Sequence, residues 1–415
     1  MNVIRVALDP SYRAGVMLDR DTLQKRLDRA TGHLETPVAA VDLAAFDDNA
    51  ARLAAIAGGK PLRVASKSVR CRALLERVLA TPGWRGVMGY TLAEAIWLVR
   101  SGVSDDVLVA YPSVDRTSIR ELTSDPVLAA AISIMVDHPA HLTLVDQVAP
   151  PGERPDVRLC LDLDASWRPG LLHFGARRSP VHSAAQAGAL ARRLVARPGF
   201  KLVGMMSYES QIAGVGDAPP RQAVRARAIR LMQARSFPEL LRRRAEAVAA
   251  VREHAELEFV NGGGTGCVAA TGTDPAVTEV AAGSGLYGPT LFDNYTAWKP
   301  TPAAFFALSV VRRPAPRIAT VLGGGWVASG PGEQSRLPQP YLPAGLRFKP
   351  DEGAGEVQTP LIGAAAAALH PGDRVWFRHA KAGELCEHVN EIQLVDGETA
   401  TPALTYRGEG HAFLG

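Results

Sequence analysis

Lys67 is the residue whose type and position first point to chemistry. It stands in the segment Leu62-Arg63-Val64-Ala65-Ser66-Lys67-Ser68, whose apolar run predicts a strand over residues 62–66. In a parallel barrel, catalytic groups lie at the carboxyl ends of the strands. A lysine amine placed there can form an imine with a carbonyl compound. Taken alone, a lysine at a strand end is more often a surface charge, so other segments must support the chemical interpretation.

Two segments rich in small residues are candidates for binding an anion. The first is Asn261-Gly262-Gly263-Gly264-Thr265-Gly266, which follows the last of the predicted barrel strands. Glycines allow backbone N–H groups to converge on an anion, and late barrel loops commonly bind phosphate. The second is Glu279-Val280-Ala281-Ala282-Gly283-Ser284-Gly285-Leu286-Tyr287-Gly288, which could donate to the same phosphate or be an ordinary crossover into the next domain. The position of the first segment favours a phosphate site over an ordinary tight turn.

Acidic and basic residues gather around the end of the sixth predicted strand. Asp162, Asp164, Arg168, Gly170 and His173 all lie within twelve positions of one another. An acid and an arginine at a strand end suit the orientation of a cofactor ring or a substrate carboxylate. A purely structural salt bridge would have the same sequence, and both interpretations stay open.

The elements that must position these residues alternate short β-branched runs with amphipathic helical segments. This alternation predicts an α/β fold, and eight such units match a (β/α)₈ barrel of about 250 residues. An open doubly wound sheet is the alternative, because periodicity does not report closure. Strands are predicted at residues 38–41, 62–66, 86–89, 107–110, 131–136, 157–163, 202–206 and 257–260, and helices at 43–57, 72–79, 92–99, 183–196 and 221–254.

Beyond Tyr295 the pattern changes to short β runs rich in Pro and Gly, which predicts a C-terminal all-β domain. Strands are predicted there at residues 305–311, 317–321, 374–377 and 391–395, and residues 330–350 are predicted to be an extended loop. The apolar run 361–369 is too short to cross a bilayer and is interpreted as a packed helix or strand edge. The predicted domains are a lead-in over residues 1–32 that packs on the β domain, a barrel over 33–296 and the β domain over 297–415.

Composition excludes several classes of protein. Lys and Arg number 46 against 42 Asp and Glu, and the basic residues are scattered or lie on short helical faces such as residues 242–244. Without interleaved aromatic residues they do not indicate nucleic-acid binding. The cysteines (Cys71, Cys160, Cys267 and Cys386) are too far apart to suggest a disulfide framework. Charged residues interrupt the first thirty positions, so no signal peptide or membrane span is predicted there, and a cytoplasmic location is expected.

The combination of these motifs resembles the fold-type III pyridoxal-phosphate enzymes, which have an alanine-racemase-like barrel and a trailing β domain. Within that group the chain is most similar to the D-threonine aldolase and D-serine dehydratase-like family. The most specific segment is Gly204-Met205-Met206-Ser207-Tyr208-Glu209-Ser210-Gln211-Ile212-Ala213-Gly214-Val215-Gly216-Asp217, and Glu35-Thr36-Pro37-Val38-Ala39-Ala40-Val41-Asp42 resembles the approach to the family's first strand. The resemblance covers residues 33–296 well and the β domain loosely.

The resemblance implies pyridoxal phosphate as cofactor and a homodimer in which a partner subunit roofs each active site. It also implies roles for particular residues. Lys67 is the expected Schiff-base lysine; Gly263, Gly264 and Thr265, joined by Ser284 and Gly285, are expected to contact the phosphate; Arg168 is expected beside the pyridine ring or its phenolic oxygen; and Tyr208 is expected to flank the imine and the phosphate.

The chain departs from the family where a divalent metal (Mn, Mg or Zn) is usually held by His-x-Asp or His-x-Cys. Here the segment reads His379-Ala380-Lys381, and a protonated lysine cannot be a ligand. Cys386 could reach the place beside His379, or Glu384 and Cys386 could take the paired ligand positions. Alternatively the metal is lost and Lys381 is a cationic substitute. We expect His379 to be catalytic and to hold the metal together with Cys386.

The expected activity is that of an aldolase that cleaves or forms a D-configured β-hydroxy-α-amino acid, with glycine or alanine and an aldehyde on the other side. A D-serine dehydratase-like ammonia-lyase is the first alternative. Racemisation ranks lower because Tyr208 does not match the tyrosine that a racemase places opposite its lysine. A non-catalytic carrier of pyridoxal phosphate is the alternative from another class, although such relatives are typically a barrel alone.

Overall fold

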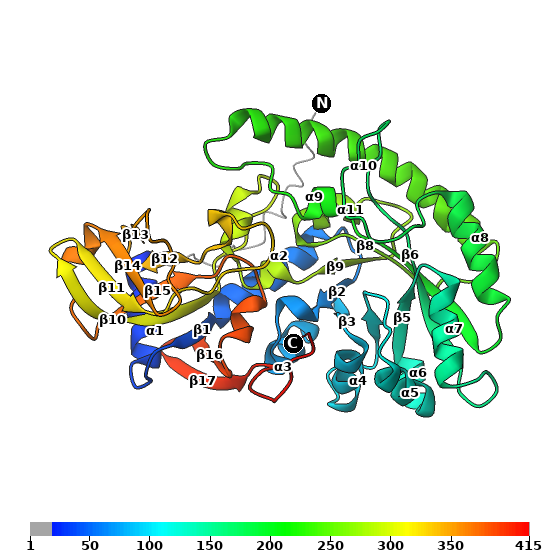
Figure 1. The fold of residues 1–415 in the computed structure, drawn as a ribbon, viewed down its shortest axis with the longest axis horizontal. Coiled ribbons are helices and arrows are strands. Elements are labelled where there is room, and N and C mark those ends of the chain that lie inside the picture. The colour runs from blue at the N-terminus through cyan, green and yellow to red at the C-terminus, as the bar shows by residue number, and fades with distance from the viewer. Residues whose placement is uncertain (1–18, 415) are drawn as a thin grey trace.

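The computed structural model describes residues 19–414. Within them, eight parallel strands close a barrel that lies beside a nine-stranded, mostly antiparallel sheet (Figure 1). This architecture confirms the predicted barrel and the predicted β domain. The barrel strands are β2 (Leu62–Ala65), β3 (Trp84–Gly89), β4 (Val107–Val109), β5 (Ile132–Val136), β6 (Val157–Asp162), β7 (Phe200–Ser207), β8 (Phe259–Gly262) and β9 (Glu279–Ala282).

Helices cover the outside of the barrel, and every helix predicted from periodicity is found to within two residues at each end. Several begin at capping residues; Asp125, for example, accepts N–H bonds at the start of α6, and Pro126 takes the first helical position. Between residues 19 and 414, no helix has both the length and the apolar character of a membrane span. The helices are α2 (Leu43–Ile56), α3 (Arg72–Leu79), α4 (Leu92–Arg100), α5 (Arg116–Ser124), α6 (Pro126–Ala131), α7 (Pro139–Val148), α8 (Ala184–Val195), α9 (Ser210–Ala213), α10 (Ala223–Arg252) and α11 (Val268–Gly272).

The assignment of the first barrel strand from sequence is wrong. Strand β1 (Val38–Asp42) pairs with β10 and β16 of the β domain, and the eighth barrel strand is β9, which was interpreted as a possible crossover. Lys67 therefore follows the first barrel strand, and the glycine segment at residues 262–266 follows the seventh. A β-branched run predicts a strand but does not report its partner, because pairing depends on distant residues.

The β domain contains more strands than its sequence pattern predicts. Its order is β13-β14-β11-β10-β1-β16-β17, with β15 pairing to β10 and β12 to β15. Strands β12 and β13 lie inside the segment 330–350, which was predicted to be an extended loop; their shortness and the flanking Pro and Gly residues concealed them. The domain's strands after β1 are β10 (Ala304–Ala315), β11 (Ile318–Leu322), β12 (Gln339–Leu342), β13 (Leu346–Phe348), β14 (Gln358–Gly363), β15 (Arg374–Arg378), β16 (Glu391–Asp396) and β17 (Thr399–Leu404).

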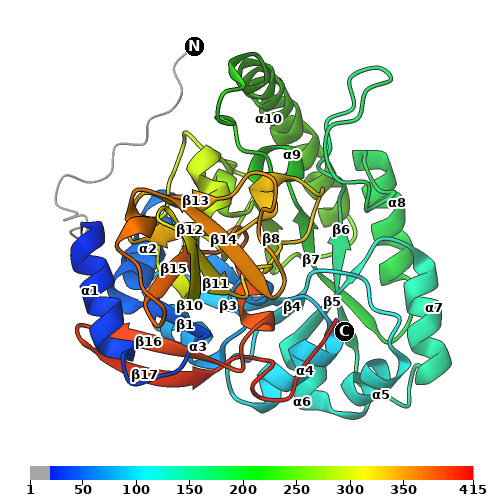
Figure 2. The ribbon, with the colours of Figure 1, turned by 60° about the vertical axis from the view of Figure 1, so that its left-hand side comes forward.

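Helix α1 (Arg20–Thr31) lies against the β domain (Figure 2). Its apolar face buries Leu23 and Leu27 in a cluster with Phe305 and Trp376. The indole Nε1 of Trp376 also donates a hydrogen bond of 2.8 Å to Asp28. The lead-in before residue 19 lies outside the described residues, and the domain boundaries at 32/33 and 296/297 stay predictions.

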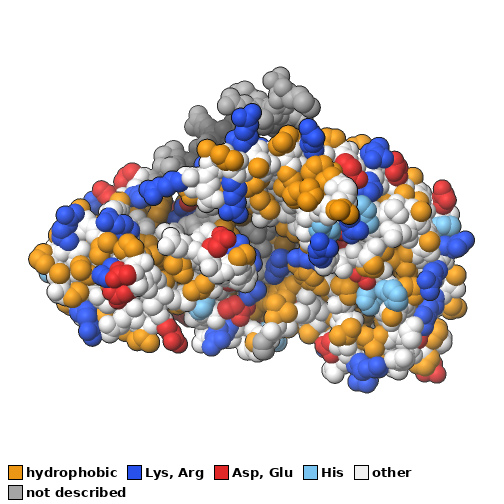
Figure 3. All heavy atoms as spheres, turned by 45° about the horizontal axis from the view of Figure 1, so that its top comes forward, with side chains coloured by type: hydrophobic (Ala, Val, Ile, Leu, Met, Phe, Trp, Pro, Cys, Tyr) orange, Lys and Arg blue, Asp and Glu red, His pale blue; other side chains and the backbone are white. Residues whose placement is uncertain are grey.

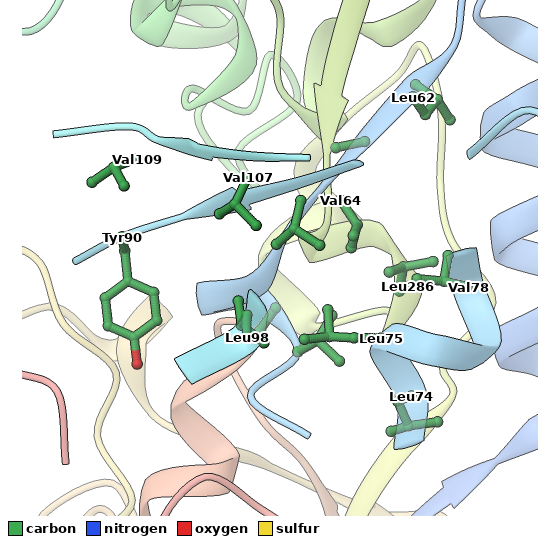
Figure 4. Close-up of a cluster of buried hydrophobic side chains, with 14 of the residues drawn as sticks. Leu62, Val64, Leu74, Leu75, Val78, Tyr90, Leu98, Val107, Val109 and Leu286 are labelled. Atoms are coloured by element: carbon green, nitrogen blue, oxygen red, sulfur yellow. The ribbon is translucent and has the colours of Figure 1, made fainter. Parts of the chain in front are cut away.

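Apolar packing between the first barrel strands and helices α3 and α4 holds the strand ends in place. Figure 4 shows side chains of β2 and β4 gathered with side chains of both helices, and those named below are fully buried. Burying a Val or Leu side chain stabilises the fold by about 1.5–3 kcal/mol. The residues are Leu62 and Val64 of β2, Val109 of β4, Leu74, Leu75 and Val78 of α3, and Leu98 of α4.

Candidate active site

A cavity of about 350 Å³ lies at the carboxyl ends of the barrel strands. A larger hollow of about 610 Å³ adjoins it and shares Lys67 and Lys381 in its wall. Figure 3 shows Lys and Arg side chains beside the recess between the two lobes of the molecule. Six of the residues predicted from sequence meet in the smaller cavity, namely Lys67, Tyr208, Gly263, Gly264, Thr265 and Ser284.

Lys67 reaches this cavity because strand β2 ends at Ala65 and the chain turns through a short 3₁₀ segment, Ser66–Ser68. The hydroxyl of Ser66 donates a 3.1 Å hydrogen bond to the carbonyl of Met88, which ties the turn to strand β3. Among residues 19–414, the amine of Lys67 has no hydrogen-bond or ion-pair partner. The turn therefore presents an unpaired amine to the cavity, as a lysine that attacks a carbonyl carbon requires.

The two glycine segments meet through Thr265. Its hydroxyl oxygen accepts the N–H groups of Gly283 and Gly285, each at 3.2 Å, so the loops after β8 and β9 form one surface. The N–H groups of Gly264, Thr265 and Ser284 find no acceptor among the described residues. Gly285 lies behind the wall, where it supports Thr265. The loops thus present free donors that suit an anion.

Close packing explains why glycine is needed in these loops. Gly263 has a φ of +88°, a conformation that favours glycine. A Cβ on Gly264 would come within 2.9 Å of Cε2 of Tyr208 and 3.0 Å of Cβ of Ala213. On Gly285 a Cβ would come within 2.6 Å of the Trp298 ring. Any side chain at these positions would displace the loops from the cavity wall.

A buried ion network fixes the first glycine loop to helix α10. The N–H of Gly263 donates to Glu209 at 2.6 Å, and Glu209 is paired with Arg244. Arg244 also reaches Asp274 at 2.6 Å and the hydroxyl of Ser207 at 2.7 Å. Arg244 lies on a helix, as predicted for the basic run 242–244, but its burial in an ion network was not anticipated from sequence. Its spacing from the buried Leu240, Ala247, Val248 and Val251 on α10 was the signal that could have found it.

Tyr208, at the end of β7, lies in the cavity wall with Arg178 and Tyr111. The guanidinium carbon of Arg178 stands 5.6 Å from the ring centre of Tyr208 and 5.5 Å from that of Tyr111, which is within cation–π range. Burial raises the pKa of Tyr208, so its phenol stays neutral. Sequence reasoning missed Arg178, since nothing local separates it from Arg177 beside it.

Arg168 lies outside the wall of this cavity. Its side chain is 39% exposed and pairs with Asp164, which also accepts the hydroxyl of Ser166 at 2.6 Å. Arg168 and Asp164 therefore form a salt bridge within their own loop, as the structural interpretation expects. A contact of Arg168 with a cofactor stays a prediction. Asp162 faces a neighbouring hollow of about 220 Å³ with Arg178, and burial raises the pKa of this carboxyl to about 7.

The predicted metal ligands lie away from the cavity wall. His379 is buried, and neither ring nitrogen has a hydrogen-bond partner among residues 19–414. Burial lowers its pKa to about 3, with Arg378 acting in the same direction and the Ala304 backbone offsetting part of the effect. The thiol of Cys386 donates to the carbonyl of Val69 at 3.2 Å, and burial raises its pKa to about 12. Within the described chain no three His, Cys, Asp or Glu side chains gather as a metal site. A metal held by His379 and Cys386 stays a prediction.

With the barrel and its cavity established, comparison with known proteins defines the class. Residues 41–290 match the family described as alanine racemase, N-terminal domain, and the chain belongs to that family. Among solved structures it is similar to D-threonine aldolase from Filomicrobium marinum, with 22% identity, 91% of this chain and 96% of the other covered, and a TM-score of 0.74. It is also similar to D-threo-3-hydroxyaspartate dehydratase from Delftia sp. HT23, with 20% identity, 90% and 97% covered and a TM-score of 0.67.

Alanine racemase from Corynebacterium glutamicum shares the fold as well, with 20% identity, 83% of this chain and 90% of the other covered, and a TM-score of 0.54. At such identities these likenesses show the fold. A search of curated proteins found no match to this chain.

The cavity fits pyridoxal phosphate, the cofactor that the fold family implies. It offers an unpaired lysine amine for the aldehyde and free N–H groups on the glycine loops for the phosphate. Among the described residues that line it are four cationic side chains, those of Lys67, Arg178, Arg336 and Lys381, and no Asp or Glu that would repel an anion. The family fold and these donors together support this cofactor.

Proposed function

We propose that this chain is a pyridoxal-phosphate-dependent lyase of the aldolase type, which cleaves or forms a D-configured β-hydroxy-α-amino acid. Cleavage would give glycine or alanine and an aldehyde, and the reverse reaction would join them. The observation that carries the proposal is the unpaired amine of Lys67 in the same cavity wall as the two glycine loops. Similarity to a D-threonine aldolase over nine tenths of the chain supports the choice of reaction.

Lys67 would bind the aldehyde carbon of the cofactor, and the N–H groups of Gly264, Thr265 and Ser284 would bind its phosphate. Bound there, the cofactor supplies an electron sink that stabilises negative charge on Cα of an amino acid. The network of Glu209 and Arg244 holds the first glycine loop in the wall that it shares with the lysine. Arg178 would complement negative charge beside Tyr208, which would donate a hydrogen bond as a neutral phenol.

Lys67 would have a second task, because its amine lies in the cavity wall and could hold a proton for an amino acid bound there. Lys381 contributes a second amine to the same wall. The wall of the smaller cavity contains no described Asp or Glu, whereas Glu384 lies in the wall of the adjoining hollow, 3.6 Å from Lys381, and partly neutralises that lysine.

A dehydratase is the second candidate, favoured by the likeness to D-threo-3-hydroxyaspartate dehydratase. In that reaction Lys67 would take the Cα proton and the β-hydroxyl would leave. If a divalent metal is bound, His379 and Cys386 would hold it, and the metal would supply Lewis acidity for the loss of a hydroxyl. We also propose a homodimer in the cytoplasm, in which the β domain of the partner covers the cavity.

The test is to load the purified protein with cofactor and supply D-threonine, D-serine and their α-methyl analogues, with and without divalent metal. Aldehyde release without ammonia supports the aldolase. Ammonia with a keto acid refutes it in favour of the dehydratase, and interconversion of enantiomers refutes it in favour of a racemase. Stable cofactor binding without any product indicates a carrier. Lys67→Ala is the control, since it should abolish every product.

A further inference from the structure

The geometry points to a carboxylate-binding subsite for the substrate, formed by Lys381, Ser329 and Arg336 where the cavity meets the larger hollow. This inference rests on the proposed function, because it assigns how the same cavity recognises its amino acid. Lys381 and Ser329 lie in the walls of both hollows, and Arg336 lies in the wall of the smaller one. All three belong to the β domain, whereas Lys67 and the glycine loops belong to the barrel.

Lys381 is held in place and is only partly neutralised. Its Nζ lies 2.5 Å from the hydroxyl of Ser329 and 3.6 Å from a carboxylate oxygen of Glu384. Glu384 in turn accepts the N–H of Ser329 at 2.9 Å, which locks the loop onto the lysine. Lys67 and Arg336 lie in the same cavity wall as Lys381 and bring like charges to it. An anion bound beside Lys381 would relieve the repulsion among these cations.

Arg336 is a guanidinium with no ionic partner among residues 19–414, and its buried Nε also has no hydrogen-bond partner. The loop packs closely against it: a Cβ on Gly330 would come within 2.9 Å of Cζ and Nε of Arg336. Gly330 has a φ of +128°, so glycine suits this position for its backbone as well as for its size. The loop thus places the guanidinium of Arg336, whose Nε–H has no acceptor, at the cavity wall.

A carboxylate is the ligand that these donors match. A guanidinium presents parallel N–H groups to the two oxygens of a carboxylate, and an ammonium adds a point charge. The cofactor's phosphate already has the free N–H groups of the glycine loops. The carboxylate that remains for Lys381 and Arg336 belongs to the amino acid, as its α-carboxylate or as a second carboxylate on its side chain.

The experiment measures binding to the cofactor-loaded protein from the change in visible absorbance of the cofactor. The probes are D-aspartate, D-alanine and propylamine, which carry two, one and no carboxylates. The variants are Lys381→Met and Arg336→Leu, with Ser329→Ala as a milder third. Matched controls are Lys349→Met and Arg347→Leu, cations of the same domain that line neither hollow. Loss of one charge-assisted hydrogen bond should weaken carboxylate binding about 10- to 100-fold and leave propylamine within about twofold.

If the variants bind only D-aspartate more weakly than wild type, the subsite recognises a side-chain carboxylate. If they bind D-aspartate and D-alanine more weakly to the same extent, it recognises the α-carboxylate. The inference is overturned if the variants weaken the binding of propylamine as much as that of the carboxylates. It is also overturned if Lys381→Met and Arg336→Leu bind the probes as the two controls do. Arg336→Lys should recover part of the affinity, which a merely misfolded variant would not do.

Calorimetric titration with succinate separates this inference from the proposed function. If no amine changes the absorbance of wild-type protein, the proposed function fails. Succinate then still tests the subsite: weaker binding by Lys381→Met and Arg336→Leu than by the controls supports it, and equal binding refutes it.

Discussion

Replacing Arg244 by leucine removes the cation at the centre of the network beneath the glycine loop. Its side chain is fully buried, and it pairs with Glu209 and Asp274, which are 0% and 1% exposed. The leucine would leave both carboxylates buried without their cation. Removing one partner of a buried ion pair typically costs about 3–5 kcal/mol of stability. We expect the free energy of unfolding to fall by that amount in Arg244→Leu.

The same substitution should also weaken cofactor binding. Glu209 accepts the N–H of Gly263 at 2.6 Å, so its release from Arg244 loosens the loop that would bind the phosphate. The loss of one charge-assisted contact of this kind corresponds to about tenfold in affinity. Titration of the variant with pyridoxal phosphate, followed by absorbance, measures this second effect.

Arg242→Leu is the matched control, because it removes an arginine of the same helix. Arg242 is 68% exposed and pairs with Glu246 at 3.2 Å, so its loss should cost less than about 1 kcal/mol. Urea unfolding of the two variants gives the comparison. If Arg244→Leu is no less stable than Arg242→Leu, the buried network does not stabilise the fold. If Arg244→Leu is unstable but binds cofactor as tightly as wild type, the network does not position the loop.

Three further predictions concern the cofactor loops and the pH dependence of stability. Lys67→Ala should lose the visible absorbance that pyridoxal phosphate gains on binding a lysine, and a surviving band would show that another amine is used. Gly264→Ala should weaken cofactor binding about tenfold or more, because its Cβ would press on Tyr208, whereas Gly332→Ala, with nothing within 4 Å, should not. Burial raises the pKa of Glu94 from its ordinary 4.5 to about 7. Between these values the folded protein holds a proton that the unfolded chain has released, so stability should fall by up to about 3 kcal/mol as pH rises through the interval. Urea unfolding at pH 5 and pH 8 should show this slope in wild type and a smaller one in Glu94→Gln; equal slopes would show that Glu94 is not its source.

The sequence by itself determined the parts of the site that depend on local pattern. The lysine after a short apolar strand and the glycine segments around Thr265 could be found because each lies within a few residues of the strand that positions it. Helix periodicity likewise placed α2, α3 and α4 to within a residue or two. A contiguous motif keeps its local geometry in any fold that contains it, so its chemistry can be anticipated before its partners are known.

The tertiary structure decided which strands close the barrel and which charges face the cavity. Strand β1 lies next to β2 in the chain, yet it pairs with β10 and β16, which come more than 250 residues later. Arg178 and Arg336 reach the cavity wall from loops with no motif, while Arg168, which stands in one, satisfies its charge on Asp164. Burial and charge pairing depend on residues that are distant in sequence, and only the folded chain brings them together.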